Sequence, residues 1–117
     1  MRAAVRTLKK CDGLILRFRH VEQPGLAVAG LIHNPKVYRE AEKIGCDFCL
    51  AGHTHGGQIR LPFFGTTIAA CSMEEQYTHG RGRLGSMVTL TSNGIGGFWP
   101  FRIKCPPEIL EITLRAS

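Results

Sequence analysis

The chain has 117 residues, of which 44% are hydrophobic and 21% are charged, a composition that excludes an intrinsically disordered chain and fits one small globular domain. Fifteen Lys and Arg against nine Asp and Glu give a formal charge of +6, which favours anionic partners such as phosphorylated substrates. The basic residues lack the dense, aromatic-interleaved runs of nucleic-acid readers, so we expect no nucleic-acid partner.

No run approaches the roughly 18 apolar residues of a membrane-spanning helix, and the basic N-terminus lacks the apolar stretch of a signal peptide. The cysteines are odd in number and irregularly spaced, which favours a reducing compartment over a secreted disulfide framework. They are Cys11, Cys46, Cys49, Cys71 and Cys105. We therefore expect a cytoplasmic protein, with peripheral membrane attachment left open.

Residues 1–28 carry the weakest pattern of apolar and polar residues in the chain. Within residues 1–20, apolar and basic residues are mixed, and residues 14–18 (LILRF) are the only plausible strand. His20 stands in an unpatterned basic run and is assigned to no site. We treat residues 1–28 as a poorly defined N-terminal segment, distinct from residues 29–117.

The next elements predict a β-α-β unit. Leu26–Ile32 (LAVAGLI) is an apolar run of strand length that ends at His33, and Asn34-Pro35 then introduces residues 36–44 (KVYREAEKI), whose apolar residues recur at helical spacing. Gly45 is a suitable helix stop. Residues 46–51 then predict a second buried strand.

The sequence Gly-His-Thr-His-Gly-Gly follows that strand, with His53 and His55 inside a glycine-rich loop. In open α/β sheets, ligands bind at the carboxyl ends of the strands, where His33 also lies. Imidazole is a ligand of divalent transition metals, and we expect the two histidines of this loop to point in different directions. The three histidines therefore predict a metal site in which the loop pair flanks two ions.

An alternative site would combine Cys46 and Cys49 with His53 and His55 in a non-catalytic zinc module. Only three residues separate the cysteine pair from the histidine pair, whereas zinc fingers leave about a dozen. Two small, core-facing cysteines are the favoured interpretation.

The second half of the chain predicts mainly β structure. Residues 58–64 alternate between polar and apolar residues, and Pro62 limits them to an edge strand or a bend. Residues 65–85 indicate a loop with short strands that could cover a site. Residues 87–92 predict a strand. Residues 98–101 (FWPF) form an aromatic cluster that we expect to pack. Strict alternation in residues 108–114 (EILEITL) predicts a half-buried closing strand.

Several of these motifs together resemble the calcineurin-like metallophosphoesterase superfamily, in its bacterial branch of UDP-2,3-diacylglucosamine pyrophosphohydrolase-like enzymes. The resemblance extends from about Ala29 to the C-terminus. The matching motifs are LIHNP (31–35), the run 45–52, HTHGGQI (53–59), LPFFG (61–65) and PPEI (106–109).

The resemblance implies an α/β fold: a partial two-sheet sandwich, with the β-α-β unit followed by mainly β structure. It also implies hydrolysis of a phosphoester or pyrophosphate, with a phosphoester or nucleotide-lipid type substrate, at a centre of two divalent ions (Mn, Fe or Zn). Carried over by motif, His33 and His53 would ligate one ion and His55 the other.

The family's Asp-x-His, Gly-Asp-x-x-Asp and Gly-Asn-His motifs do not occur in this sequence, and Asp12 and Asp47 are its only aspartates. We therefore expect residues 29–117 to be the C-terminal portion of such a domain, inactive alone. Its partners would be the missing N-terminal half or a second copy of the chain. No catalytic residue beyond the metal ligands is assigned.

Overall fold

A computed structural model of the chain describes residues 2–8, 13–19, 26–63, 66–69 and 75–113. The strands are β1 (Arg2–Leu8), β2 (Gly13–Arg19), β3 (Leu26–Ile32), β4 (Phe48–Ala51), β5 (Arg60–Phe63), β6 (Thr66–Ala69), β7 (Gly80–Leu84) and β8 (Met87–Thr91). The helical elements are the 3₁₀ turn η1 (Pro35–Val37), α1 (Tyr38–Lys43), the 3₁₀ turn η2 (His55–Gly57) and α2 (Glu75–Thr78). No described helix has the length and apolar character needed to cross a membrane.

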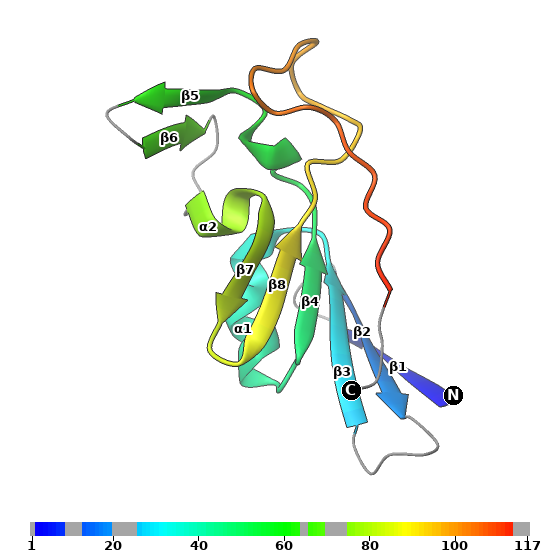
Figure 1. Cartoon of the computed structure of the whole chain (residues 1–117). Coiled ribbons are helices and arrows are strands. Elements are labelled where there is room, and N and C mark those ends of the chain that lie inside the picture. Colours follow the sequence, from blue (N-terminus) through cyan, green and yellow to red (C-terminus); the bar gives the residue numbers. More distant parts are fainter. Residues whose placement is uncertain (1, 9–12, 20–25, 64–65, 70–74, 114–117) are drawn as a thin grey trace.

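Six strands form a mixed sheet in the order β1-β2-β3-β4-β8-β7, and β5 pairs with β6 as a separate hairpin (Figure 1). The pairs β3–β4 and β4–β8 are parallel, and the outer pairs are antiparallel. The predicted α/β class is therefore confirmed. The strand predicted at residues 14–18 lies inside β2, which pairs with β3 across its whole length.

The predicted β-α-β unit is present. Asn34 begins the helical segment, since its Oδ1 accepts a hydrogen bond from the backbone N–H of Lys36 at 3.0 Å and Pro35 occupies the first helical position. Gly45, at φ +80°, provides the left-handed residue that ends the helical segment. The helix thus crosses one face of the sheet and returns the chain to a parallel strand.

The core lies between α1 and the sheet. Because successive side chains of a strand alternate between faces, one face of β4 and β8 carries the buried residues. The core residues are Ile32, Tyr38, Ala41, Cys46, Cys49, Ala51, Tyr77 and Met87.

Buried hydroxyl groups also join the elements around this core. The hydroxyl groups of Tyr38 and Thr91 are hydrogen-bonded at 2.8 Å, and Thr91 Oγ1 donates to the carbonyl of Tyr77 at 3.0 Å. Burial raises the pKa of Tyr38, so the phenol remains neutral.

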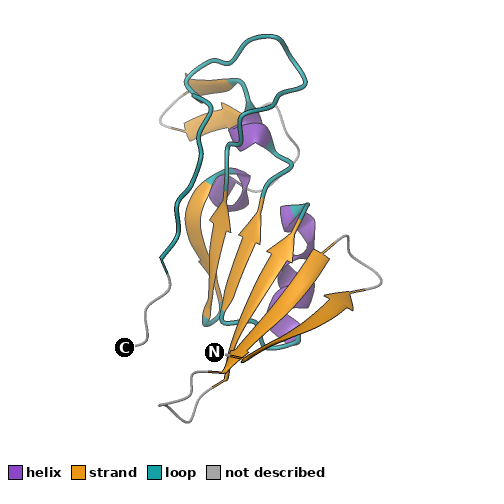
Figure 2. Cartoon of the chain, turned by 90° about the vertical axis from the view of Figure 1, so that its right-hand side faces the viewer, coloured by secondary structure: helices purple, strands orange, loops and turns teal. Residues whose placement is uncertain are grey.

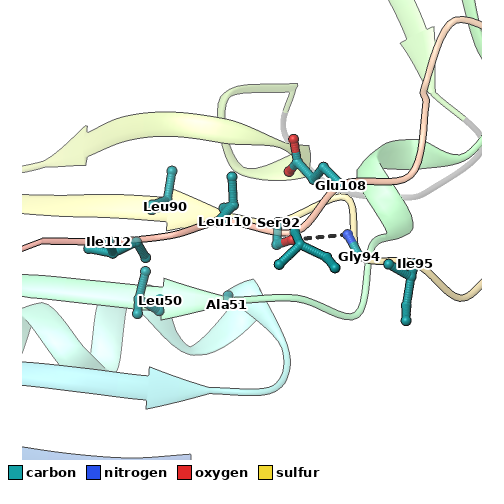
Figure 3. A pocket seen from close by; sticks show the side chains of 10 residues that line it. Leu50, Ala51, Leu90, Ser92, Gly94, Ile95, Glu108, Leu110 and Ile112 are labelled. Carbon is teal, nitrogen blue, oxygen red and sulfur yellow. Dashed lines mark hydrogen bonds between the residues drawn. The ribbon is translucent and has the colours of Figure 1, made fainter.

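Within the described part of the chain, an extended segment, residues 108–113, lies over the opposite face of the sheet. Figure 2 shows α1 and this C-terminal segment on opposite sides of the sheet. Leu110 and Ile112 lie beside Leu50 and Leu90 and line a shallow groove of about 320 Å³ (Figure 3). The groove is apolar, and Ile109 next to it is 85% exposed.

The closing strand predicted at residues 108–114 is wrong for its described part, because residues 108–113 form no strand. The backbone N–H of Glu108 donates to the carbonyl of Gly94 at 3.1 Å, and its carboxylate accepts from the N–H of Asn93 at 2.7 Å. Alternation defines two faces, but a strand also needs a partner for its backbone, and the described strands offer none here. Residue 114 lies outside the described residues.

Candidate metal centre

His33 and His53 are brought together by the parallel pairing of β3 and β4. His33 follows the last residue of β3, and His53 lies two residues beyond the end of β4. The backbone N–H of Gly52 donates to the carbonyl of His33 at 3.2 Å. As a result, His33 Nε2 and His53 Nδ1 lie 2.8 Å apart, with ring centroids separated by 4.6 Å in an edge-to-face arrangement.

The histidine loop has a left-handed backbone at residues other than glycine. His53, His55 and Gln58 have φ values of 67°, 51° and 54°. Such conformations are uncommon for these residue types and persist where the surrounding structure enforces them. Thr54 provides one such constraint, since its buried hydroxyl donates to the carbonyl of Thr78 at 2.6 Å and accepts from the N–H of Gly56 at 3.3 Å.

The surroundings favour a neutral imidazole at His53. Partial desolvation lowers the pKa of His53, and the positive charges of His33, His55 and Lys36 act in the same direction. A neutral ring keeps the nitrogen lone pair that a metal ion needs. The close approach of His33 likewise requires that one of the two facing nitrogens accept the hydrogen bond.

His55 stands apart from this pair in its contacts. Its carbonyl accepts hydrogen bonds from Arg102 Nη1 at 3.1 Å and from the Cys105 thiol at 3.2 Å. The described residues contain no group of three or more His, Cys, Asp or Glu side chains that could hold one metal ion. The geometry therefore unites His33 and His53 and does not add His55 to them.

The donor set fits part of a metal site. With metal–nitrogen bonds of roughly 2.1 Å, two neighbouring ligands of one ion stand about 3.0–3.4 Å apart, so the two histidine nitrogens, 2.8 Å apart, would need to separate by a few tenths of an ångström to bind one ion. Imidazole suits Zn, Mn and Fe. Two nitrogens leave most of a coordination shell unfilled, so His33 and His53 are compatible with a partial site.

Cys46 and Cys49 are core residues, as the sequence favoured. They are 3% and 0% exposed, and both are free thiols. The pKa of Cys49 is raised to about 12, mainly because burial disfavours the thiolate, and the neighbouring Cys46 acts in the same direction. Because the thiolate is the form that binds metal, this environment opposes the alternative zinc module with His53 and His55.

A network around Gln58 and Arg102 was not predicted from the sequence. Gln58 is 4% exposed, and its amide bonds to the backbone of residues 98–101. The Arg102 guanidinium donates to the carbonyl groups of His55, Asn93 and Cys105. These contacts join positions up to 47 residues apart, and a single sequence carries no local pattern that reports them.

Comparison with known proteins supports the metallophosphoesterase resemblance. The chain is 33% identical over 84 residues to the phosphodiesterase YaeI of Escherichia coli, an alignment that covers 72% of this chain and 31% of YaeI. It is 35% identical over 88 residues to the uncharacterized metallophosphoesterase YkuE of Bacillus subtilis, covering 74% of this chain and 30% of YkuE. A metallophosphoesterase of Campylobacter jejuni, Cj0846, is 33% identical over 89 residues, covering 74% of this chain and 22% of that protein.

The predicted relationship to metallophosphoesterases is therefore confirmed over about three quarters of the chain. The alignments span about a third or less of each of these relatives. No family model and no solved structure matches the chain.

Proposed function

We propose that this chain contributes part of the metal centre of a phosphoester or pyrophosphate hydrolase. The observation that carries the proposal is the 2.8 Å approach of His33 Nε2 to His53 Nδ1 at the carboxyl ends of two parallel strands. In the proposed centre, these two histidines bind one divalent ion and His55 binds a second. Relatives named as phosphodiesterase and metallophosphoesterase support the reaction class.

Divalent ions at such a centre would polarise a phosphoryl oxygen and lower the pKa of a water molecule. The role of the chain itself is to position the imidazoles. Asn34 and Thr54 serve this role through the backbone, because Asn34 caps the helical segment that follows His33 and Thr54 fixes the loop between the other two histidines. The hydrogen bonds of both side chains go to backbone groups or to another threonine's carbonyl, so both act on the segments that carry the ligands.

The proposed centre needs further ligands. The Asp47 carboxylate accepts a hydrogen bond from the N–H of Val28 at 2.9 Å, at the amino end of β4 and away from the histidines. Glu108 is engaged with Asn93. Without a bridging carboxylate, three histidines divided between two ions would bind both weakly. We therefore expect the chain alone to show little or no turnover.

The reaction class can be tested by complementation. The purified chain is mixed with the part of YkuE that lies outside the alignment to this chain, and hydrolysis of an aryl phosphodiester is followed with Mn²⁺. We expect turnover that requires both pieces and the metal and is lost with His53→Ala. Turnover that survives His53→Ala in the complemented sample would overturn the assignment.

A second arm tests whether this chain is sufficient. Robust Mn²⁺-dependent turnover by the chain alone, lost with His53→Ala, would keep the assigned site but contradict the expected inactivity. His20→Ala, at a histidine with no assigned role, provides the control for both arms.

A further inference from the structure

The segment that follows β8 extends beyond the carboxyl ends of β4 and β8 (Figure 1) and carries a group of exposed apolar side chains. We call these five residues the apolar tip. They are Ile95, Phe98, Trp99, Phe101 and Ile103, with exposed fractions of 75%, 84%, 49%, 52% and 39%. The aromatic rings contact one another, since the Trp99 centroid lies 5.4 Å from Phe98 and 6.4 Å from Phe101. The aromatic residues were expected to pack and not to bind a partner; the rings pack against one another and are exposed.

The buried Gln58 side chain fixes the backbone of the apolar tip. Its Nε2 donates to the carbonyl of Trp99 at 2.8 Å and to that of Phe101 at 3.0 Å, while its Oε1 accepts from the N–H of Phe98 at 2.8 Å. The chain also pairs at Ile103, whose backbone exchanges hydrogen bonds with Gln58 and Arg60. Three residues of the tip are thus held by one buried amide.

Arg102 fixes the same segment from inside. Its guanidinium donates to five backbone carbonyl groups, those of His55, Asn93, Gly94, Gly96 and Cys105. The polar groups of this segment are therefore turned inward, and its apolar side chains are turned outward. A loop that only needed to be soluble would bury its aromatic rings or lack them, so this inverted arrangement indicates an apolar partner.

An exposed cationic side chain, Lys104, follows the apolar tip. Residues 76–107 contain no Asp or Glu, and neither do residues 48–73, whereas Glu108 lines the same groove as Ile95. The Arg102 guanidinium is turned inward, and Nε of Arg60 is buried. Exposed aromatic rings that include a tryptophan, next to an exposed lysine, are the chemistry of a contact with an anionic lipid surface.

We propose that the apolar tip docks on the surface of an anionic lipid bilayer. Phe98 and Trp99 enter the interfacial region, and Lys104 lies toward the headgroups. Because Arg102 joins the tip segment to the carbonyl of His55, docking would place the histidine loop close to headgroup phosphates. That last consequence rests on the proposed function, whereas docking itself does not.

The single tryptophan of the chain makes docking measurable directly. The metal-free chain is titrated with vesicles of phosphatidylcholine containing phosphatidylglycerol, and with vesicles of phosphatidylcholine alone, while Trp99 emission and cosedimentation are recorded. We expect a blue shift and binding with the anionic vesicles, weakened by salt. Brominated acyl chains should quench Trp99, a readout that needs no variant.

Paired variants localise the contact. Phe98→Ser with Phe101→Ser should lower the affinity for anionic vesicles by about tenfold or more, since two aromatic contacts are lost. Ile44→Ser, at a 43% exposed residue near the other end of the sheet, should leave the affinity unchanged. Circular dichroism checks that both variants fold as the wild type does.

Unchanged Trp99 emission with anionic vesicles, equal binding to neutral vesicles, or full affinity in the Phe98/Phe101 variant would each overturn docking. Self-association that the Phe98/Phe101 variant abolishes, without vesicle binding by the wild type, would assign the tip to a second copy and also overturn it. The assay contains no metal and measures no turnover, so failure of the proposed hydrolase function would leave its outcome unaffected.

Discussion

At the residue scale, the histidine loop shows how backbone conformation determines which ligands can converge. In a regular strand, residues i and i+2 would lie on the same face, but His53 and His55 both adopt positive φ, with Thr54 in the right-handed helical region between them. The loop therefore directs His53 toward His33 at the neighbouring strand end. The sequence indicated the three histidines, whereas the left-handed backbone depends on the Thr54 contact to Thr78, 24 residues away.

Cys49 provides a residue-scale prediction. Its folded pKa of about 12 lies above the ordinary value of 9.0, so the stability linked to the neutral thiol is present below pH 9 and is lost as pH rises toward about 12. We expect the free energy of unfolding to fall across this alkaline range. Iodoacetamide at neutral pH should modify Cys49 at least about tenfold more slowly in the folded chain than in urea.

Peptide mass mapping of the alkylated chain measures the second effect. Equal modification rates with and without urea would show that Cys49 is accessible. Such a result would support the alternative zinc module that includes Cys46. That module predicts that Cys46→Ser weakens metal binding. The hydrolase proposal predicts no such loss.

At the element scale, the close approach of β3 and β4 depends on a glycine. A Cβ atom at Gly30 would lie 2.8 Å from Cys49 Sγ and 3.5 Å from Cys46 Sγ. We expect Gly30→Ala to destabilise the chain by about 1–3 kcal/mol through overpacking. Urea unfolding at matched protein concentration measures the change.

Two further variants make that result specific. Gly96→Ala, where an added Cβ meets no atom within 4 Å, should change stability by less than about 0.5 kcal/mol. Combining Gly30→Ala with Cys49→Ala should recover part of the loss, since the clashing sulfur is removed. Strictly additive losses in the double variant would show that the contact is not the cause.

The tip segment is an element whose order depends on Gln58. Gln58→Leu removes three hydrogen bonds to residues 98–101 and should cost about 1–3 kcal/mol of local stability. We expect lower Trp99 fluorescence anisotropy and faster amide exchange at Phe98. Gln76→Leu, at an exposed position on α2, is the control, and an equal loss of order in both variants would contradict the role of Gln58.

Local patterns predicted some elements and failed for others, for identifiable reasons. The segment from β3 to β4 was predictable because Asn34, Pro35 and Gly45 mark the limits of its helix through contacts within a few residues. The described residues of the segment 108–114 alternate like a strand, yet they have no strand partner. Residues 98–101 are apolar enough to be buried, and their backbone is held by the side chain of Gln58, 40 to 43 residues away in the sequence.

At the scale of the whole molecule, the chain exposes more surface than its mass predicts. Its accessible surface is 8271 Å², against roughly 6300 Å² for a compact chain of 12.9 kDa. The half-buried Leu50 and Leu90 lie on the sheet face opposite α1, beside the apolar groove. An open apolar face of this kind is consistent with a missing partner, which we propose to be the rest of a metallophosphoesterase domain or a second copy.

The open face leads to a prediction about association. Without its partner, the isolated chain should self-associate in a concentration-dependent manner, as analytical ultracentrifugation would measure. Leu90→Lys should reduce association, whereas Ile44→Lys, at an exposed residue that follows α1, should not. A monomeric sample that unfolds cooperatively on heating would contradict this prediction.

The most direct test of the central claim is a metal titration of the purified chain. Zn²⁺ or Mn²⁺ is titrated into the wild type and into the variants His33→Ala, His53→Ala, His55→Ala and His20→Ala. The proposed centre predicts weak metal binding. His33→Ala and His53→Ala should each lower the affinity by at least about tenfold, because each removes one of two ligands. His20→Ala should leave the affinity unchanged. His55→Ala should preserve this first ion, because His55 belongs to the second. Equal affinity in the wild type, His33→Ala and His53→Ala would show that the two imidazoles do not share an ion.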